Sequence, residues 1–205
     1  MSVTPNVYVV DDDSAIRTSL QRLFHSADIA CEVFESAEAF LARPLTEGPR
    51  CLLLDVNLAH GTGFDLQQVL HERGQHFPII FMTGYGTIAM SVRAIKAGAR
   101  EFLTKPFEPE QLLDLVREAL ACDARSLAER SLTCDVRERF ESLTPREKQV
   151  MALLITGKMN KQIAAELGTS EVTAKVHKKH VMTKMSARNV IELLKMNERL
   201  GSLSE

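Results

Sequence analysis

Short apolar runs alternate, along the first half of the chain, with longer stretches in which apolar residues recur every three or four positions. The short runs predict strands buried on both faces, and the longer stretches predict amphipathic helices. The expected strands are residues 7–10, 29–34, 51–55, 78–82 and 101–104, and the last two helices are residues 87–97 and a helix that begins near Pro109. Five strands that alternate with five helices predict an α/β fold, with a parallel sheet covered by helices on both faces.

Only helical periodicity remains after residue 140. Thr144-Pro145-Arg146-Glu147 combines a capping box with proline at the first helical position, which predicts a helix start. Further helices are expected at 160–167, at 171–185 and from Ser186 onward. The pair joined by Gly168-Thr169-Ser170 predicts a helix-turn-helix in an all-α domain.

The segment between these regions has helical spacing and contains neither glycine nor proline before Pro145. One long helix and a helix with a frayed middle both fit this pattern, and a break is expected at Ser131-Leu132-Thr133. We therefore expect a domain at residues 1–121, a helical linker at 122–140 and a second domain at 141–205.

Charge divides the chain in the same way. Residues 1–122 carry 10 basic and 16 acidic side chains, a net charge of −6, whereas residues 143–205 carry 11 and 6, a net charge of +5. The basic second domain indicates a nucleic-acid partner. No secretory signal and no run of 18 apolar residues is present, and the four cysteines are scattered, so we expect a cytoplasmic protein without a membrane or zinc site.

Polar side chains follow four of the expected strands. Asp11 and Asp12 come after the first strand, Asp55 ends the third, Thr83 follows the fourth and Lys105 follows the fifth. The carboxyl ends of parallel strands lie along one edge of a sheet, so these side chains can converge. Crowded carboxylates need a cation, and a set of oxygen ligands favours Mg²⁺.

Asp55 is the expected reactive group of this set. A metal ion, an ammonium group and a hydroxyl around one carboxylate can neutralise and hydrogen-bond the three oxygens of a phosphoryl group. A carboxylate is also an accepted nucleophile for phosphoryl transfer. The residues thus predict a phosphorylated aspartate.

This arrangement, over about residues 5–121, resembles the receiver domain of two-component response regulators. The resemblance implies a flavodoxin-like fold with sheet order 2-1-3-4-5, and Asp55 as phosphoacceptor with Thr83 and Lys105 on the phosphoryl oxygens. It also implies that Phe102 is a conformational switch, although a strand aromatic can equally be plain core. The implied Mg²⁺ ligands are Asp12, the Asp55 carboxylate, the Asn57 main-chain carbonyl and, through water, Asp11.

Two features depart from this reading or compete with it. The loop Leu58-Ala59-His60-Gly61 lacks the proline that receivers usually carry after the acceptor. Asp11-x-Asp13-Ser14 loosely resembles the nucleophile motif of haloacid-dehalogenase phosphatases, but the close threonine and the downstream acidic pair of that family are missing. We therefore interpret Asp13 as negative charge at a helix start, with Ser14 as the cap.

The helix expected at 171–185 carries the candidate DNA contacts. Val172, Val176 and either Val181 or Met182 are expected to point inward, and the opposite face is basic. Lysines neutralise phosphates, while threonine and histidine reach base edges in the major groove. The candidates are Lys161, Thr173, Lys175, His177, Lys178 and Lys179; for His177 a structural role and a phosphate contact remain equally open.

Residues 141–199 resemble the LuxR-type DNA-binding domain of NarL/FixJ-like response regulators. The matching pieces are Leu143-Thr144-Pro145-Arg146-Glu147, Asn160-Lys161-x-Ile163-Ala164 and Thr173-x-Lys175-x-His177, with Ala174 where the family usually has valine. Together the two resemblances imply a transcription regulator that a sensor histidine kinase phosphorylates with Mg²⁺, and that dimerises and binds promoter DNA. Its own chemistry would be limited to self-phosphorylation and slow dephosphorylation. The alternative is a phosphotransfer protein or an aspartate-nucleophile phosphatase with an unrelated basic domain.

Overall fold

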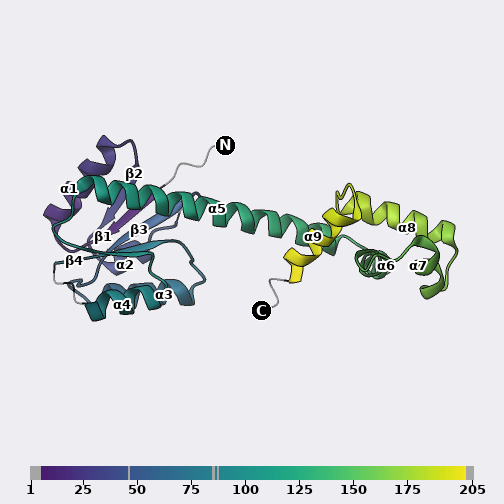
Figure 1. The fold of residues 1–205 in the computed structure, drawn as a ribbon. Helices are drawn as coiled ribbons and strands as arrows, with labels where there is room; N and C mark the ends of the chain where they lie inside the picture. The colour runs from purple at the N-terminus through teal and green to yellow at the C-terminus, as the bar shows by residue number, and fades with distance from the viewer. Residues whose placement is uncertain (1–5, 46, 85, 87, 202–205) are drawn as a thin grey trace. The chain divides into compact units, whose positions relative to one another are not determined.

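The computed structural model describes residues 6–45, 47–84, 86 and 88–201. Thr87, the expected start of one helix, lies outside the described residues. The chain divides into two compact units, Met1–Leu127 and Ala128–Glu205. The first unit combines a sheet with helices, and the second is helical (Figure 1).

The first unit is built on a five-stranded sheet in the order β2-β1-β3-β4-β5. All neighbouring strands run parallel. The strands are β1 (Asn6–Val10), β2 (Ala30–Phe34), β3 (Arg50–Asp55), β4 (Ile79–Thr83) and β5 (Glu101–Thr104). The predicted α/β class and the flavodoxin-like order 2-1-3-4-5 are confirmed.

Helices cover both faces of this sheet (Figure 1). They are α1 (Ser14–Ser26), α2 (Ala37–Leu41), α3 (Gly63–Glu72), α4 (Ile88–Lys96) and α5 (Pro109–Glu141). Successive side chains of a strand point to opposite faces. In β3, Leu52 and Leu54 therefore pack with α2, α3 and α4, while Cys51 and Leu53 pack with α1 and α5. Both faces are buried, which explains why the strand sequences are apolar without alternation.

The cap of α1 differs from the prediction. Asp13, not Ser14, is the N-cap residue, and its side chain accepts hydrogen bonds from the main-chain N–H groups of Ala15 at 2.7 Å and Ile16 at 3.4 Å. Ser14 is the first helical residue. Both residue types are good N-caps, so sequence preference alone did not decide between them.

Helix α5 is continuous over 33 residues, and the predicted break at Ser131-Leu132-Thr133 is wrong. The hydroxyl of Thr133 donates to the main-chain oxygen of Glu129 at 2.9 Å, one turn back in the helix. This bond satisfies the polar group without interrupting the backbone ladder.

Asp123 ties α5 to the start of β3. Its side chain is 2 % exposed, and its Oδ2 accepts a hydrogen bond from the main-chain N–H of Arg50 at 2.8 Å. A buried carboxylate needs such a donor. The first unit thus includes the part of α5 that follows residue 121, as far as Leu127.

The second unit contains a helix-turn-helix. Its helices after α5 are α6 (Pro145–Ile155), α7 (Asn160–Glu166), α8 (Glu171–Lys184) and α9 (Val190–Gly201). The predicted capping box is present, with Thr144 and Glu147 bonded reciprocally. The last helix begins at Val190, not at Ser186, because Ser186 adopts φ 54°, outside the helical region. Within the described part of the chain, no helix is both long and apolar enough to cross a membrane.

Candidate functional site

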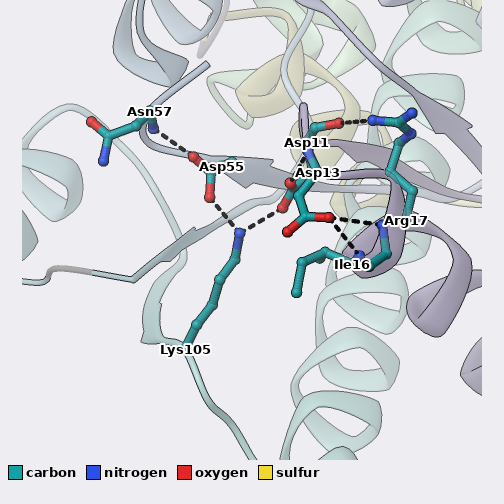
Figure 2. A network of polar contacts seen from close by, with 8 residues as sticks. Asp11, Asp13, Ile16, Arg17, Asp55, Asn57 and Lys105 are labelled. Carbon is teal, nitrogen blue, oxygen red and sulfur yellow. Dashed lines mark hydrogen bonds and ion pairs between the residues drawn. The ribbon is translucent and has the colours of Figure 1, made fainter. Parts of the chain in front are cut away.

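Asp11, Asp55 and Lys105 meet at the carboxyl edge of the sheet, as the sequence predicts (Figure 2). Lys105 Nζ lies 2.6 Å from Asp11 Oδ2 and 2.5 Å from Asp55 Oδ1. Asp55 Oδ2 accepts a hydrogen bond of 2.6 Å from the main-chain N–H of Asn57. One cationic atom therefore bridges two carboxylates that come from neighbouring strands.

Burial gives these charges their strength. The side chains of Asp11, Asp55 and Lys105 are 1 %, 7 % and 18 % exposed. Burial raises the pKa of Asp55, against the lowering effect of the Lys105 ammonium group. Burial alone would lower the pKa of Lys105, but its bonds to the two carboxylates outweigh that effect and raise it. Lys105 thus stays protonated at neutral pH, and Asp55 is a carboxylate in a partly desolvated environment.

The donor set fits a magnesium ion. Two carboxylates already converge on a single cationic atom within 2.6 Å. Asp12, beside them in sequence, is exposed to solvent. Among the described residues no three acidic, histidine or cysteine side chains form a metal site by themselves. Mg²⁺ typically takes one or two carboxylates and keeps several waters, so it suits this arrangement.

Thr83 and Phe102 lie close together around Gly86, which sequence reasoning missed. The side chain of Thr83 is fully buried, and its main-chain oxygen accepts a hydrogen bond from the N–H of Lys105 at 2.7 Å. A Cβ atom added to Gly86 would lie 2.6 Å from Thr104, 3.1 Å from Phe102 and 3.4 Å from Thr83. Gly86 therefore lies directly beside both candidate residues. Phe102 itself is partly buried against the core.

Gly63 is a second glycine that the sequence pattern did not single out. A Cβ atom there would lie 2.4 Å from the main-chain oxygen of Asp55 and 2.9 Å from Leu54. Helix α3 thus begins in contact with the strand end that carries Asp55. Neither glycine has a local sequence signal, because both are needed for contacts between distant segments.

In the second unit, the predicted inward direction of Val172 and Val176 is wrong. Val172 is 74 % exposed and Val176 is 47 % exposed, whereas Ala174 and Val181 are buried in the core. The reason is helical spacing: residues 172, 175, 176 and 179 fall on one face, so the valines lie beside Lys175 and Lys179. Helical spacing counted from Val181 places Ala174, two turns earlier, on the buried face, and so predicts that Val172 and Val176 are exposed.

Three of the candidate DNA contacts, Lys175, Lys178 and Lys179, line a hollow of about 810 Å³. Lys161, Thr173, Lys175 and Lys179 are exposed, and His177 and Lys178 are partly buried. His177 Nδ1 is buried and has no hydrogen-bond partner among the described residues. Residues at the hollow that sequence reasoning missed are Asn160, Val172, Val176, Arg188 and Asn189.

A buried carboxylate, Glu147, joins α6 to α8. Its Oε2 accepts hydrogen bonds from Lys184 Nζ at 2.7 Å and from the Thr144 N–H at 2.8 Å. His180 Nδ1 lies 3.6 Å from its other oxygen. The hydrogen bond from Lys184, together with the one from the Thr144 backbone, lowers the pKa of Glu147 from 4.5 to about 2.

We expect Glu147→Gln to destabilise this unit by about 1–3 kcal/mol at pH 7, because the amide cannot satisfy the Lys184 ammonium group as a carboxylate does. In the unchanged protein this stability is present above pH 4.5 and is lost as the pH falls towards 2, because only the folded state holds the lowered pKa. Urea unfolding of the whole chain, followed by circular dichroism between pH 7 and pH 3, measures both effects. Glu171→Gln, at an exposed position, is the control; equal midpoints for the two variants would contradict the expectation.

The fold and the site define a class: an α/β domain with an acidic, lysine-bridged edge, joined to a helix-turn-helix domain. Residues 7–117 match the family described as response regulator receiver domain. Residues 141–197 match the family described as bacterial regulatory proteins, luxR family. The chain belongs to the response regulators that combine these two domains.

Relatives match over nearly the whole chain. Nodulation protein W of Bradyrhizobium diazoefficiens is 45 % identical over 195 residues, which cover 95 % of this chain and 86 % of that protein. The transcriptional regulatory protein FixJ of the same species is 38 % identical and is covered completely, as is this chain. The solved structure of the response regulator StyR has a TM-score of 0.88 and 43 % identity, covering 96 % of this chain and 99 % of that one. The chain is a phosphorylation-dependent transcription regulator, whose receiver implies a histidine kinase partner and whose luxR-type domain implies DNA binding.

Proposed function

We propose that Asp55 accepts the phosphoryl group and that residues 1–121, 122–140 and 141–205 act as receiver, linker and DNA-binding domain. The observation that carries the proposal is the 2.5 Å contact between Lys105 Nζ and Asp55 Oδ1 in a buried site. Asp55 is the carboxylate at the end of the central strand β3, with one oxygen on Lys105 and the other on the Asn57 N–H.

In the proposed reaction, an Asp55 oxygen forms a bond to phosphorus while the bond from phosphorus to the histidine nitrogen of the kinase breaks. The freed imidazole keeps the electron pair of that bond and takes a proton from solvent. Asp12, Asp55, the Asn57 carbonyl and, through water, Asp11 would hold Mg²⁺, which would supply positive charge to the phosphoryl oxygens. Lys105 and the Thr83 hydroxyl bind the other phosphoryl oxygens. The chain's own chemistry is limited to this self-phosphorylation and to slow dephosphorylation.

The phosphoryl group then shifts the protein towards a dimer. Drawing Thr83 towards the phosphoryl group displaces Gly86, which lies beside Phe102. Phe102 changes rotamer as its neighbours move. The surface of α4 supports a dimer face, since Val92 and Ile95 are 46 % and 48 % exposed. Exposed apolar side chains in the same helix can be buried against a second copy.

Two copies place two helix-turn-helix units on two half-sites of double-stranded promoter DNA. Lys161, Lys175, Lys178 and Lys179 are assigned to the phosphate backbone, and His177 either to a phosphate or to a structural role. Thr173 is assigned to the major groove, and the exposed Val176 on the same helix can contact thymine methyl groups. Lysines at phosphates set affinity and its salt dependence, whereas groove contacts set sequence preference.

Labelling with acetyl phosphate and Mg²⁺, combined with gel-filtration mass, tests the proposal. Asp55→Ala is expected to lose labelling and dimerisation together. Asp114→Ala removes an exposed carboxylate of the same unit and is expected to behave like the unchanged protein. Labelling that survives in Asp55→Ala would show that another residue is the acceptor.

A further inference from the structure

The main chain of Asp11 is bonded to two different elements, β2 and α1. Its N–H donates a hydrogen bond to the main-chain oxygen of Phe34, the last residue of β2, at 3.2 Å. Its carbonyl oxygen instead accepts a hydrogen bond from Arg17 Nη1 at 2.7 Å. Arg17 is partly buried in α1, and Figure 2 shows its guanidinium group directed at the Asp11 backbone.

The loop from β1 to α1 is fixed by further bonds of its own. Asp11 Oδ1 accepts a hydrogen bond from the main-chain N–H of Asp13 at 2.9 Å. Asp13 in turn caps α1 through Ala15 and Ile16. In this network, the α1 side chain that binds the loop is Arg17, through the Asp11 carbonyl. Asp12 lies between these fixed points with its side chain exposed.

We infer that Arg17 is a positioning residue of the phosphoacceptor site, which holds the backbone of Asp11 and Asp12 in the geometry that receives a divalent cation. This inference rests on the proposed function. Arg17 does not touch the reacting atoms; it acts through the Asp11 carbonyl. A charged donor on a neutral carbonyl makes a stronger bond than a neutral donor, so it orders the loop before the metal arrives.

The positive charge of Arg17 has an opposite effect, because it repels a metal ion. Two observations indicate that ordering outweighs repulsion. The guanidinium group binds the backbone oxygen of Asp11. The two carboxylate oxygens of Asp11 are bonded instead to the Asp13 N–H and to Lys105 Nζ. It also lies at a partly exposed position, where solvent screens its charge. Removing Arg17 should therefore weaken metal binding.

Binding of Mn²⁺ to the full chain, followed by electron paramagnetic resonance of the free ion, tests this without any reaction. We expect Arg17→Met to weaken Mn²⁺ binding about tenfold, equivalent to about 1.4 kcal/mol. Arg17→Lys, which keeps one charged donor, should recover part of the loss. Arg22→Met removes the same charge from an exposed position of α1 and should bind as the unchanged protein does.

Labelling by acetyl phosphate adds a second readout. In Arg17→Met the Mg²⁺ concentration for half-maximal labelling should rise about tenfold while the rate at saturating Mg²⁺ stays unchanged, as loss of loop order alone predicts. Mn²⁺ binding that is equal to or tighter than that of the unchanged protein in both Arg17 variants would overturn the inference. A different result, unchanged Mn²⁺ binding in Asp55→Ala and Asp12→Ala, would instead reject the proposed metal site itself.

Discussion

Lys105→Met is expected to lower the free energy of unfolding by about 3 kcal/mol and to make the remaining stability depend on Mg²⁺. The variant leaves two buried carboxylates, Asp11 and Asp55, facing each other without the ammonium group that now bridges them. Breaking a buried ion pair on one side costs about 3–5 kcal/mol, and the partial exposure of Lys105 favours the lower end of that range.

The same change should tighten divalent binding. If Mg²⁺ is held at the acidic edge as proposed, it competes with Lys105 for the Asp55 carboxylate, which Lys105 Nζ contacts at 2.5 Å. Without the lysine, Mn²⁺ affinity should rise about tenfold, and saturating Mg²⁺ should restore most of the lost stability by binding only the folded state.

Urea unfolding of the full chain with and without Mg²⁺, together with Mn²⁺ titration, measures both effects. Lys96→Met removes an exposed lysine from α4 and serves as the control for charge loss alone. If Lys105→Met bound Mn²⁺ no more tightly than Lys96→Met, competition between the lysine and the metal would be excluded.

The second large effect is expected at Gly63. Gly63→Ala should destabilise the first unit by about 2–4 kcal/mol, because the added methyl group would lie 2.4 Å from the Asp55 carbonyl oxygen, with Leu54 at 2.9 Å and Phe81 at 3.0 Å behind it. A backbone oxygen at the end of a central strand cannot yield as a flexible side chain can. Relief is possible only if α3 moves away from β3.

That movement would also disturb Asp55, so labelling by acetyl phosphate should slow together with the loss of stability. Gly84→Ala is the matched control in the same unit, since a Cβ atom there meets nothing within 4 Å. The measurement is the urea midpoint of the full chain. A Gly63→Ala midpoint within experimental error of Gly84→Ala would show that the helix start adapts freely.

The sheet and the acidic edge were predictable because their causes are local. A run such as Cys51 to Leu54 is apolar on both faces only when both faces are buried, and the polar residue that follows then lies at the strand end. Lys105 was predictable for the same reason, although its bridge between Asp11 and Asp55 depends on distances that no local pattern encodes.

What the sequence did not reveal depends on contacts between distant segments. Gly63 and Gly86 are small because another segment approaches them. The valines of α8 were misjudged because apolar residues were assumed to face the core, whereas Val172 and Val176 lie on the exposed face of the helix. The roles of Thr83, Phe102 and the individual DNA contacts remain predictions.

The continuity of α5 has a consequence for the lifetime of the protein in a cell. Proteases cut extended, exposed chain, most often in loops and at termini. Between Leu127 and Ala128, where one unit gives way to the other, the chain is helical throughout. Cleavage there must wait until the helix opens locally, so the rate at which separate halves arise is governed by that opening equilibrium.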